Sequence, residues 1–301
     1  MLLAALAATL LAAPVRAQPA GELDATLNES VVMVPKKAVL GSVELQTTLF
    51  RPPGDGPFPL VVINHGKAPG DPAFQARARY PVAVREFVAR GYAVAIPMRQ
   101  GFAGSRGYYV GSGCNVAGNG QAQADDVRAV IEWLATQPWV DATAIVVVGQ
   151  SHGGWTTLAF GAKPTPGVRA LVNFAGGLRQ ETCVAWEDGL ARAAGEYGAS
   201  SRLPSLWFYG DNDSYFRPDT FRAMHAAYTG AGGTAKLVAF GHWPHGDAHA
   251  MFSSRAGRAV WLPEVEALLA RVGLPTRVVA PVVSPAHAAP VPPDAPRRAP
   301  N

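Results

Sequence analysis

The 301-residue sequence predicts an α/β domain with a mostly parallel sheet that is covered by helices on both faces. Short apolar runs recur along the chain and end at Gly or Pro, a pattern typical of parallel strands buried on both faces. Amphipathic segments with helical spacing alternate with these runs. The hydrophobic fraction of 49% is enough for a sizeable core.

Six apolar runs are expected to form the parallel part of the sheet. They are LVVINHG (60–66), YAVAIPM (92–98), AIVVVG (144–149), RALVNFAG (169–176), LPSLWFYG (203–210) and AKLVAFG (235–241). Helical patterns cover residues 79–91, 124–137, 155–163, 217–230 and 257–273. Asp125 and Asp126 are expected to open the second helix, because carboxylates suit a helix N-terminus. Residues 30–54 lack a helical pattern and are expected to form an antiparallel hairpin at one edge.

The two ends of the chain differ from its middle. Residues 1–17 hold an apolar stretch followed by Val15 and Ala17 at the −3 and −1 positions of an A-x-A-like cleavage site, and we interpret them as a signal peptide. No Lys or Arg precedes the apolar stretch, so an amphipathic or disordered leader is the alternative. Residues 279–301 are rich in Pro and Ala and are expected to form a disordered tail.

The predicted domain therefore covers residues 18–278. Within it, residues 178–202 are long for a crossover and are expected to form a small cap over the carboxyl edge of the sheet. The net charge is +4, but Lys and Arg are scattered, so no nucleic-acid partner is expected. No segment after the leader has 18 continuous apolar residues, so no membrane span is predicted.

The strand predicted at 144–149 leads into Gly-Gln-Ser-His-Gly (149–153), a G-x-S-x-G motif. A strand before it and a helix after it are the setting that a nucleophile elbow requires. The sharp turn lifts the serine hydroxyl clear of the sheet, and glycines avoid collisions of a Cβ with neighbouring backbone. It also aims the next N–H at the point where an oxyanion develops. The motif predicts Ser151 as nucleophile and the N–H of His152 as an oxyanion donor.

The acid and the histidine of such a site follow the serine in that order, each after the carboxyl end of a strand. The loop DNDSYF after residues 203–210 offers Asp211 and Asp213. The loop HWPHGDAHAMF after residues 235–241 offers His242, His245 and His249. The order and the placement both fit a Ser-Asp-His set.

Between about residues 40 and 273 the sequence resembles the α/β-hydrolases, and within them the dienelactone hydrolase-like group. The motifs that carry the resemblance are NHGKAPG, MRQGFAGSRG, GQSHGGW, YGDNDSYF and GDAHAMF. The resemblance implies Asp213 as the acid, through a G-x-x-D turn that begins at Gly210. Asp211 is the alternative acid, or it caps the loop. The resemblance also implies His249 as the base and the backbone N–H of Lys67 as the second oxyanion donor. Dienelactone hydrolases proper use a cysteine nucleophile, so the serine here favours ordinary ester chemistry.

The histidine-rich loop has a competing interpretation as a metal site, formed by His242, His245, Asp247 and His249. Pro244 prevents a helix there, so the H-x-x-H spacing does not bring ligands onto one helical face. With the elbow present, we predict neither a metal nor a cofactor.

Loops after the strands also contain aromatic residues and both cysteines. The aromatic residues expected to line a substrate pocket are Tyr108, Tyr109, Trp186, Tyr215 and Trp243. Cys114 follows the strand at 92–98 and Cys183 follows the strand at 169–176. Because both loops emerge at the carboxyl edge and export would place them in an oxidising compartment, a Cys114–Cys183 disulfide is predicted, with two unrelated thiols as the alternative.

The sequence thus predicts a periplasmic or secreted serine hydrolase that cleaves small-molecule carboxylic esters through an acyl-enzyme. Two alternatives remain. GQSHGGW also looks like the elbow of prolyl oligopeptidase-type peptidases, and the same scaffold could serve as a catalytically silent binding protein.

Overall fold

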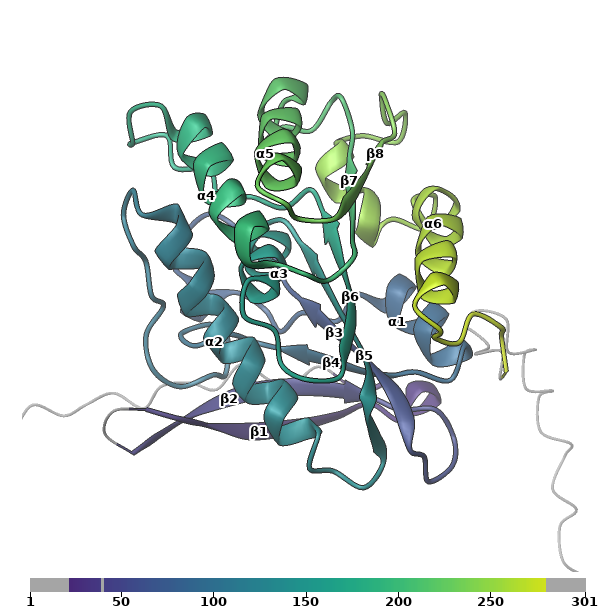
Figure 1. Cartoon of the computed structure of the whole chain (residues 1–301). Helices are drawn as coiled ribbons and strands as arrows, with labels where there is room; N and C mark the ends of the chain where they lie inside the picture. The colour runs from purple at the N-terminus through teal and green to yellow at the C-terminus, as the bar shows by residue number, and fades with distance from the viewer. Residues whose placement is uncertain (1–21, 39–40, 280–301) are drawn as a thin grey trace, which may run out of the picture.

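The computed structural model of this chain describes residues 22–38 and 41–279 (Figure 1). The predicted signal peptide, and the predicted tail beyond its first residue, lie outside these ranges. A single sheet of eight strands forms the centre of the described part, in the order β1-β2-β4-β3-β5-β6-β7-β8. Its strands are β1 (Ser30–Lys37), β2 (Ser42–Phe50), β3 (Phe58–Asn64), β4 (Ala93–Pro97), β5 (Val140–Gln150), β6 (Val168–Phe174), β7 (Ser205–Tyr209) and β8 (Ala235–Ala239).

The sheet has the predicted mixture of pairings. β1 and β2 pair as an antiparallel hairpin at one edge, and β2 joins β4 antiparallel. From β4 through β3, β5, β6 and β7 to β8 every pairing is parallel. The six apolar runs of the sequence therefore form the parallel strands as expected, and their carboxyl ends share one edge.

Helices cover both faces of the sheet, as Figure 1 shows. They are α1 (Pro81–Ala89), α2 (Val116–Leu134), α3 (His152–Gly161), α4 (Trp186–Ser200), α5 (Pro218–Gly230) and α6 (Arg258–Arg271), with short 3₁₀ turns at Ala25–Leu27, Pro72–Phe74 and Ala248–Ser253. Two apolar cores result. Leu60 and Val62 of β3 pack on the face of α2 to α5, whereas Val61 and Ile63 pack on the face of α1 and α6. This alternation is what the two-residue period of a strand demands.

The second helix begins earlier than the sequence predicts. α2 begins at Val116 and is capped by Asn115, whose side chain accepts a hydrogen bond from the N–H of Gly118. Asp125 and Asp126 therefore lie inside the helix, not at its start. The prediction was wrong because glycines in the first turns have a low helix propensity and mask the periodic pattern.

Residues 178–202 do not form the expected cap as one unit. Most of them are α4, which packs between α2 and α5 and contributes the buried Leu190 and Ala194 to the core on that face. The long connection is thus an ordinary crossover helix, and only the residues before it reach the carboxyl edge. Within the described ranges, no helix has the length and apolar character to cross a membrane.

Candidate active site

Ser151 lies between the end of β5 and the start of α3, in a backbone conformation that side chains rarely adopt. Its φ is 57° and its ψ is −126°. Its N–H donates to the carbonyl of Phe174 at 2.9 Å, and its carbonyl accepts from Trp155 in the first turn of α3. The turn is therefore held from both sides, so the strain at Ser151 is stored in a fixed geometry.

The glycines of the motif are required by close backbone approach. A Cβ on Gly149 would come within 2.1 Å of the carbonyl oxygen of Gly153. A Cβ on Gly153 would come within 2.0 Å of the carbonyl oxygen of Asn64, at the end of β3. Only glycine at both positions lets the strand pass directly into the helix.

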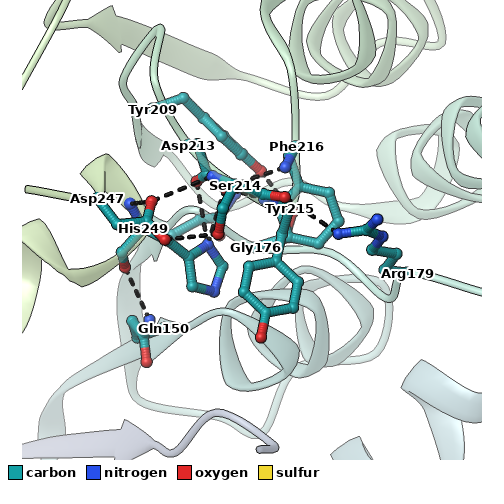
Figure 2. A network of polar contacts seen from close by, with 11 residues as sticks. Gln150, Gly176, Arg179, Tyr209, Asp213, Ser214, Tyr215, Phe216, Asp247 and His249 are labelled. Carbon is teal, nitrogen blue, oxygen red and sulfur yellow. Dashed lines mark hydrogen bonds and ion pairs between the residues drawn. The ribbon is translucent and has the colours of Figure 1, made fainter. Parts of the chain in front are cut away.

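Asp213 and His249 are brought together from the loops after β7 and β8 (Figure 2). Nδ1 of His249 lies 3.0 Å from Oδ2 and 3.1 Å from Oδ1 of Asp213. The Asp213 side chain is fully buried, and its Oδ1 also accepts from the N–H groups of Tyr215 and Phe216. A buried carboxylate that is satisfied in this way fixes the orientation of the imidazole ring.

Asp247 binds the two loops to each other, as the dashed contacts of Figure 2 show. Its carboxylate accepts from the hydroxyl and the N–H of Ser214, next to Asp213, and from the N–H of His249 at 2.9 Å. Burial opposes its ionisation, but these hydrogen bonds outweigh burial, so the pKa of Asp247 lies below its ordinary value.

Ser151 and His249 face the same cavity, of about 450 Å³, at the carboxyl edge of the sheet. Among the described residues no hydrogen bond joins the two side chains. Contacts of this kind are often long before a substrate is bound. A second cavity, of about 600 Å³, also reaches Ser151 and is bounded by His152.

Gln150, the residue before the serine, joins the His249 loop to the loop after β3. Its Nε2 donates to the carbonyl of His249 at 3.0 Å, and its Oε1 accepts from the hydroxyl of Tyr80 at 3.2 Å. That hydroxyl in turn accepts from the N–H of Gly66. Burial raises the pKa of Tyr80 to about 12, so the hydroxyl keeps its proton.

Arg99, in the loop after β4, lies fully buried behind His65 and His152. Nη1 donates to the carbonyl of His65 at 2.8 Å, Nη2 lies 3.1 Å from Nδ1 of His152, and Nε donates to Gln123. Burial lowers the pKa of Arg99 to about 10. Burial, with the Arg99 charge added, also holds the pKa values of both histidines well below their usual range.

The backbone N–H groups of Lys67 and His152 are the expected oxyanion donors, and both residues line the second cavity with Ser151. Within residues 22–38 and 41–279, neither N–H has an intramolecular hydrogen-bond partner. The N–H of His152 is free because it is the first of α3. The ring of His152 is buried against Arg99 and Asn119, not available as a second base.

The alternative acid and bases lie elsewhere. Asp211 is exposed and its N–H donates to Gly241. His242 and His245 are exposed, and the ring of His245 packs on Trp243 at 4.8 Å. In the part of the chain that the structure describes, no group of three His, Cys, Asp or Glu side chains is placed to hold a metal ion.

Two of the five expected pocket aromatics line the cavities, namely Tyr109 and Tyr215. Tyr108 is 87% exposed and lines neither. Trp186 is the first residue of α4 and packs against the core, and Trp243 is buried on the α1/α6 side of the sheet. The position of a residue after a strand places it near the edge but does not fix the direction of its side chain.

The predicted disulfide is present between Cys114 and Cys183, with their Cα atoms 5.7 Å apart. It joins the loop before α2 to the loop before α4. Beside it, Nε2 of Gln180 donates to the carbonyl of Gly113 at 3.0 Å. Gln180 and Ser112 both line the second cavity, so the bridge stands at the rim of that cavity.

Sequence reasoning missed the supporting residues Tyr80, Arg99 and Gln150, and it treated Asp247 only as a possible ligand. A lone charge directly after a buried strand, as in IPMRQG, was the signal that could have marked Arg99. The partner of Gln150 is 99 residues away, so no local pattern indicates it.

Comparison with solved structures shows the fold. A protein described as a dienelactone hydrolase from Klebsiella pneumoniae superposes with a TM-score of 0.58 at 19% identity, over 81% of this chain and 98% of that one. An esterase from Pyrococcus furiosus gives a TM-score of 0.58 at 14% identity, over 83% of this chain and 94% of that one.

A puromycin-hydrolyzing peptidase from Mycobacterium tuberculosis also gives a TM-score of 0.58, at 19% identity, over 84% of this chain. This chain spans only 41% of that peptidase. A comparison with curated proteins found no match.

The predicted resemblance is therefore confirmed at the level of the fold, which is of the α/β-hydrolase type and dienelactone hydrolase-like. A family model described as X-Pro dipeptidyl-peptidase (S15 family) matches residues 41–203, which is more than half of the sequence. The chain belongs to the S15 peptidase family of α/β-hydrolases.

Proposed function

We propose that this chain hydrolyses carboxylic esters, with Ser151 as nucleophile, His249 as general base and acid, and Asp213 as the group that orients the ring. One observation carries the proposal. The serine at a strained strand-to-helix turn shares a cavity with a histidine whose Nδ1 is held by a buried carboxylate. No cofactor takes part in this chemistry.

The reaction follows from the positions of these groups. Nε2 of His249 accepts the proton of Ser151 as the hydroxyl attacks the ester carbonyl. The carbonyl oxygen becomes an oxyanion, which the N–H groups of Lys67 and His152 stabilise. His249 then gives the proton to the departing alkoxide, leaving an acyl-enzyme. A water molecule, activated by the same ring, releases the acid.

A peptidase is the second candidate, and the S15 family match favours it. The same groups can cleave an amide, but an amine is a poorer leaving group than an alcohol. The two candidates are separated by an ester and an amide of the same acid. We expect the ester to be cleaved much faster than the amide. The ratio of the two enzymatic rates should exceed the ratio of the uncatalysed hydrolysis rates of the same two compounds.

A silent binding protein on this scaffold is the third possibility, and labelling with a fluorophosphonate tests it. We expect one label per chain, on Ser151, and none on Ser151→Ala. Ser112→Ala is the matched control, since Ser112 also faces the second cavity but lies outside the elbow. Wild-type protein that folds but takes no label and cleaves no ester would contradict the proposal.

We also infer that the protein is exported to the periplasm or the exterior. The Cys114–Cys183 bridge supports this, because disulfides persist mainly in oxidising compartments. N-terminal sequencing of material from the native host tests it, with cleavage after Ala17 as the expected result.

A further inference from the structure

Two cavities meet at Ser151, and they share part of their lining. The loop Lys67–Pro69 and the ring of Tyr215 border both of them. The cavity of about 450 Å³ is lined by His249, whereas the cavity of about 600 Å³ is lined by His152. His249 does not line the larger cavity, and His152 does not line the smaller one.

The geometry of the tetrahedral intermediate gives each cavity a role. The central carbon carries the serine oxygen, the oxyanion, the leaving oxygen and the acyl chain. The leaving oxygen must lie next to the group that protonates it, so it lies on the side of His249. The acyl chain then points away from His249. We propose that the 450 Å³ cavity receives the alcohol and the 600 Å³ cavity receives the acyl group, an inference that rests on the proposed ester hydrolysis.

The alcohol cavity is the smaller of the two, and apart from Lys67 no Lys, Arg, Asp or Glu side chain lines it. Ala76, Ala78 and Pro69 form part of its wall. The polar side chains Tyr80 and Gln150 already bind each other. The neighbouring Arg77 and Arg79 point away and pair with the buried Glu29. This wall fits a compact, neutral alcohol and offers no partner for a charged one.

Lys67 borders both cavities, but its charge belongs to the acyl side. Its Nζ donates to the carbonyls of Ala68 and Gly70. It also lies 5.7 Å from the ring centroid of Tyr109, which lines the acyl cavity alone. The ammonium group therefore does not compensate a charged alcohol.

The acyl cavity is lined by charged side chains of both signs and by neutral polar ones. Arg179 lies 5.8 Å from the ring centroid of Tyr215 and pairs with Glu181, and both side chains border the cavity. The hydroxyl of Tyr109 accepts from Asn119, so its own proton is free to donate into the cavity. Gln180 is adjacent. These groups suit an acyl chain with its own oxygen or nitrogen atoms, and the preferred substrate is an ester of a polar acid and a small neutral alcohol.

Hydrolysis through an acyl-enzyme allows a test that separates the two cavities. Esters that share an acid and differ in alcohol form the same acyl-enzyme, so only acylation senses the alcohol. The substrates are methyl and benzyl esters of N-acetylglycine and of hexanoic acid, whose acyl groups have equal numbers of non-hydrogen atoms. Rates are normalised to alkaline hydrolysis of each ester. For the wild type, we expect N-acetylglycine esters to be preferred about tenfold.

Two variants block one cavity each. Ala76→Phe narrows the alcohol cavity at an exposed position, and Ser112→Phe narrows the acyl cavity. We expect Ala76→Phe to lower kcat/KM about tenfold for benzyl esters, to spare methyl esters, and to leave deacylation after the burst unchanged. Ser112→Phe should lower kcat/KM for both N-acetylglycine esters by one common factor and slow deacylation. Leu178→Trp is a second variant of the acyl cavity, should Ser112→Phe fail to fold.

The reverse pattern would overturn the inference: slower deacylation in Ala76→Phe, or discrimination between alcohols in Ser112→Phe. A wild-type preference for the hexanoic esters would overturn the polar-acyl assignment. These outcomes all require hydrolysis, so they differ from failure of the proposed function, in which the wild type hydrolyses none of the four esters.

Discussion

Nη2 of Arg99 lies 3.1 Å from Nδ1 of His152, the residue that follows the proposed nucleophile. Arginine can only donate, so Nδ1 must be the acceptor and the ring proton sits on Nε2. That nitrogen lies 2.8 Å from Oδ1 of Asn119. His152 is thus a neutral ring with a hydrogen bond at each nitrogen. Arg99 holds this first residue of α3 and, through another hydrogen bond, the carbonyl of His65.

Replacing Arg99 should weaken both sides of the oxyanion hole. His65 lies two residues before Lys67, and His152 carries the other donor, so Arg99→Met should displace both N–H groups. We expect kcat to fall about 10- to 100-fold with KM little changed, because oxyanion contacts tighten in the transition state. Steady-state kinetics with one ester measures this.

The matched control is Arg106→Met, an exposed arginine in the same loop, which should keep full activity. Arg99→Met also leaves buried acceptors unpaired, at a cost of about 1–3 kcal/mol each. Thermal unfolding checks that the variant is folded at the assay temperature. A folded Arg99→Met protein with wild-type kcat would contradict the role in the oxyanion hole.

The triad residues should behave as one unit. Ser151→Ala, Asp213→Asn and His249→Ala should each lower kcat by several orders of magnitude, and the Ser151→Ala/His249→Ala double variant should be barely slower than either single one. His245→Ala is the control for His249→Ala, since its exposed ring does not contact Asp213. Loss of activity in His245→Ala with near-full activity in His249→Ala would reverse the assignment.

The sequence predicted the inner parallel strands well because β3 to β7 are mostly apolar runs, and burial on both faces requires such runs; β8, at the edge of the sheet, is only partly buried. It placed Ser151, Asp213 and His249 at one edge because parallel strands end together. It could not predict the direction of Trp186 or Trp243. The direction of each ring depends on its packing against residues that are distant in the sequence.

The start of α2 shows the same limit at the local scale. Gly118 and Gly120 are poor helix formers, and the helix there is stabilised by packing and by the Asn115 cap. A Cβ on Gly120 would come within 2.2 Å of the hydroxyl of Tyr197 in α4, so a long-range contact explains this glycine. The contact between Gly120 and Tyr197 cannot be predicted from residue spacing alone.

The two buried histidines should make folding sensitive to mild acid. The pKa values of His65 and His152 are depressed in the folded chain, mainly by burial. As the pH falls below about 6.5, the unfolded chain binds protons on both rings and the folded chain does not. The free energy of unfolding should therefore fall with pH, by up to about 1.4 kcal/mol per pH unit for each ring.

Urea unfolding between pH 7.5 and 5.5 measures this slope. His152→Asn should remove about half of it, because one of the two rings is gone. His245→Asn, at an exposed position, is the matched control and should keep the slope. A free energy of unfolding that stays constant over this range would show that the two rings are not held neutral.

The Cys114–Cys183 bridge should stabilise the chain and hold one wall of the acyl cavity. It closes a loop with a sequence separation of 69 residues, for which chain entropy gives about 4 kcal/mol as an upper figure. We expect the Cys114→Ser/Cys183→Ser variant to unfold at a lower temperature. We also expect a higher KM for N-acetylglycine esters, because Ser112 and Gln180 stand beside the bridge.

The effect on KM should depend on the acid and not on the alcohol, since Ser112 and Gln180, beside the bridge, line only the acyl cavity. Treatment of the wild type with a reductant should reproduce the variant, and the variant itself should not respond to reductant. The rate of fluorophosphonate labelling should change little, because Ser151 and its partners are held by the sheet and by Asp247. Thiol counting on denatured, unreduced protein from the native host gives the direct answer: two free thiols per chain would rule the bridge out.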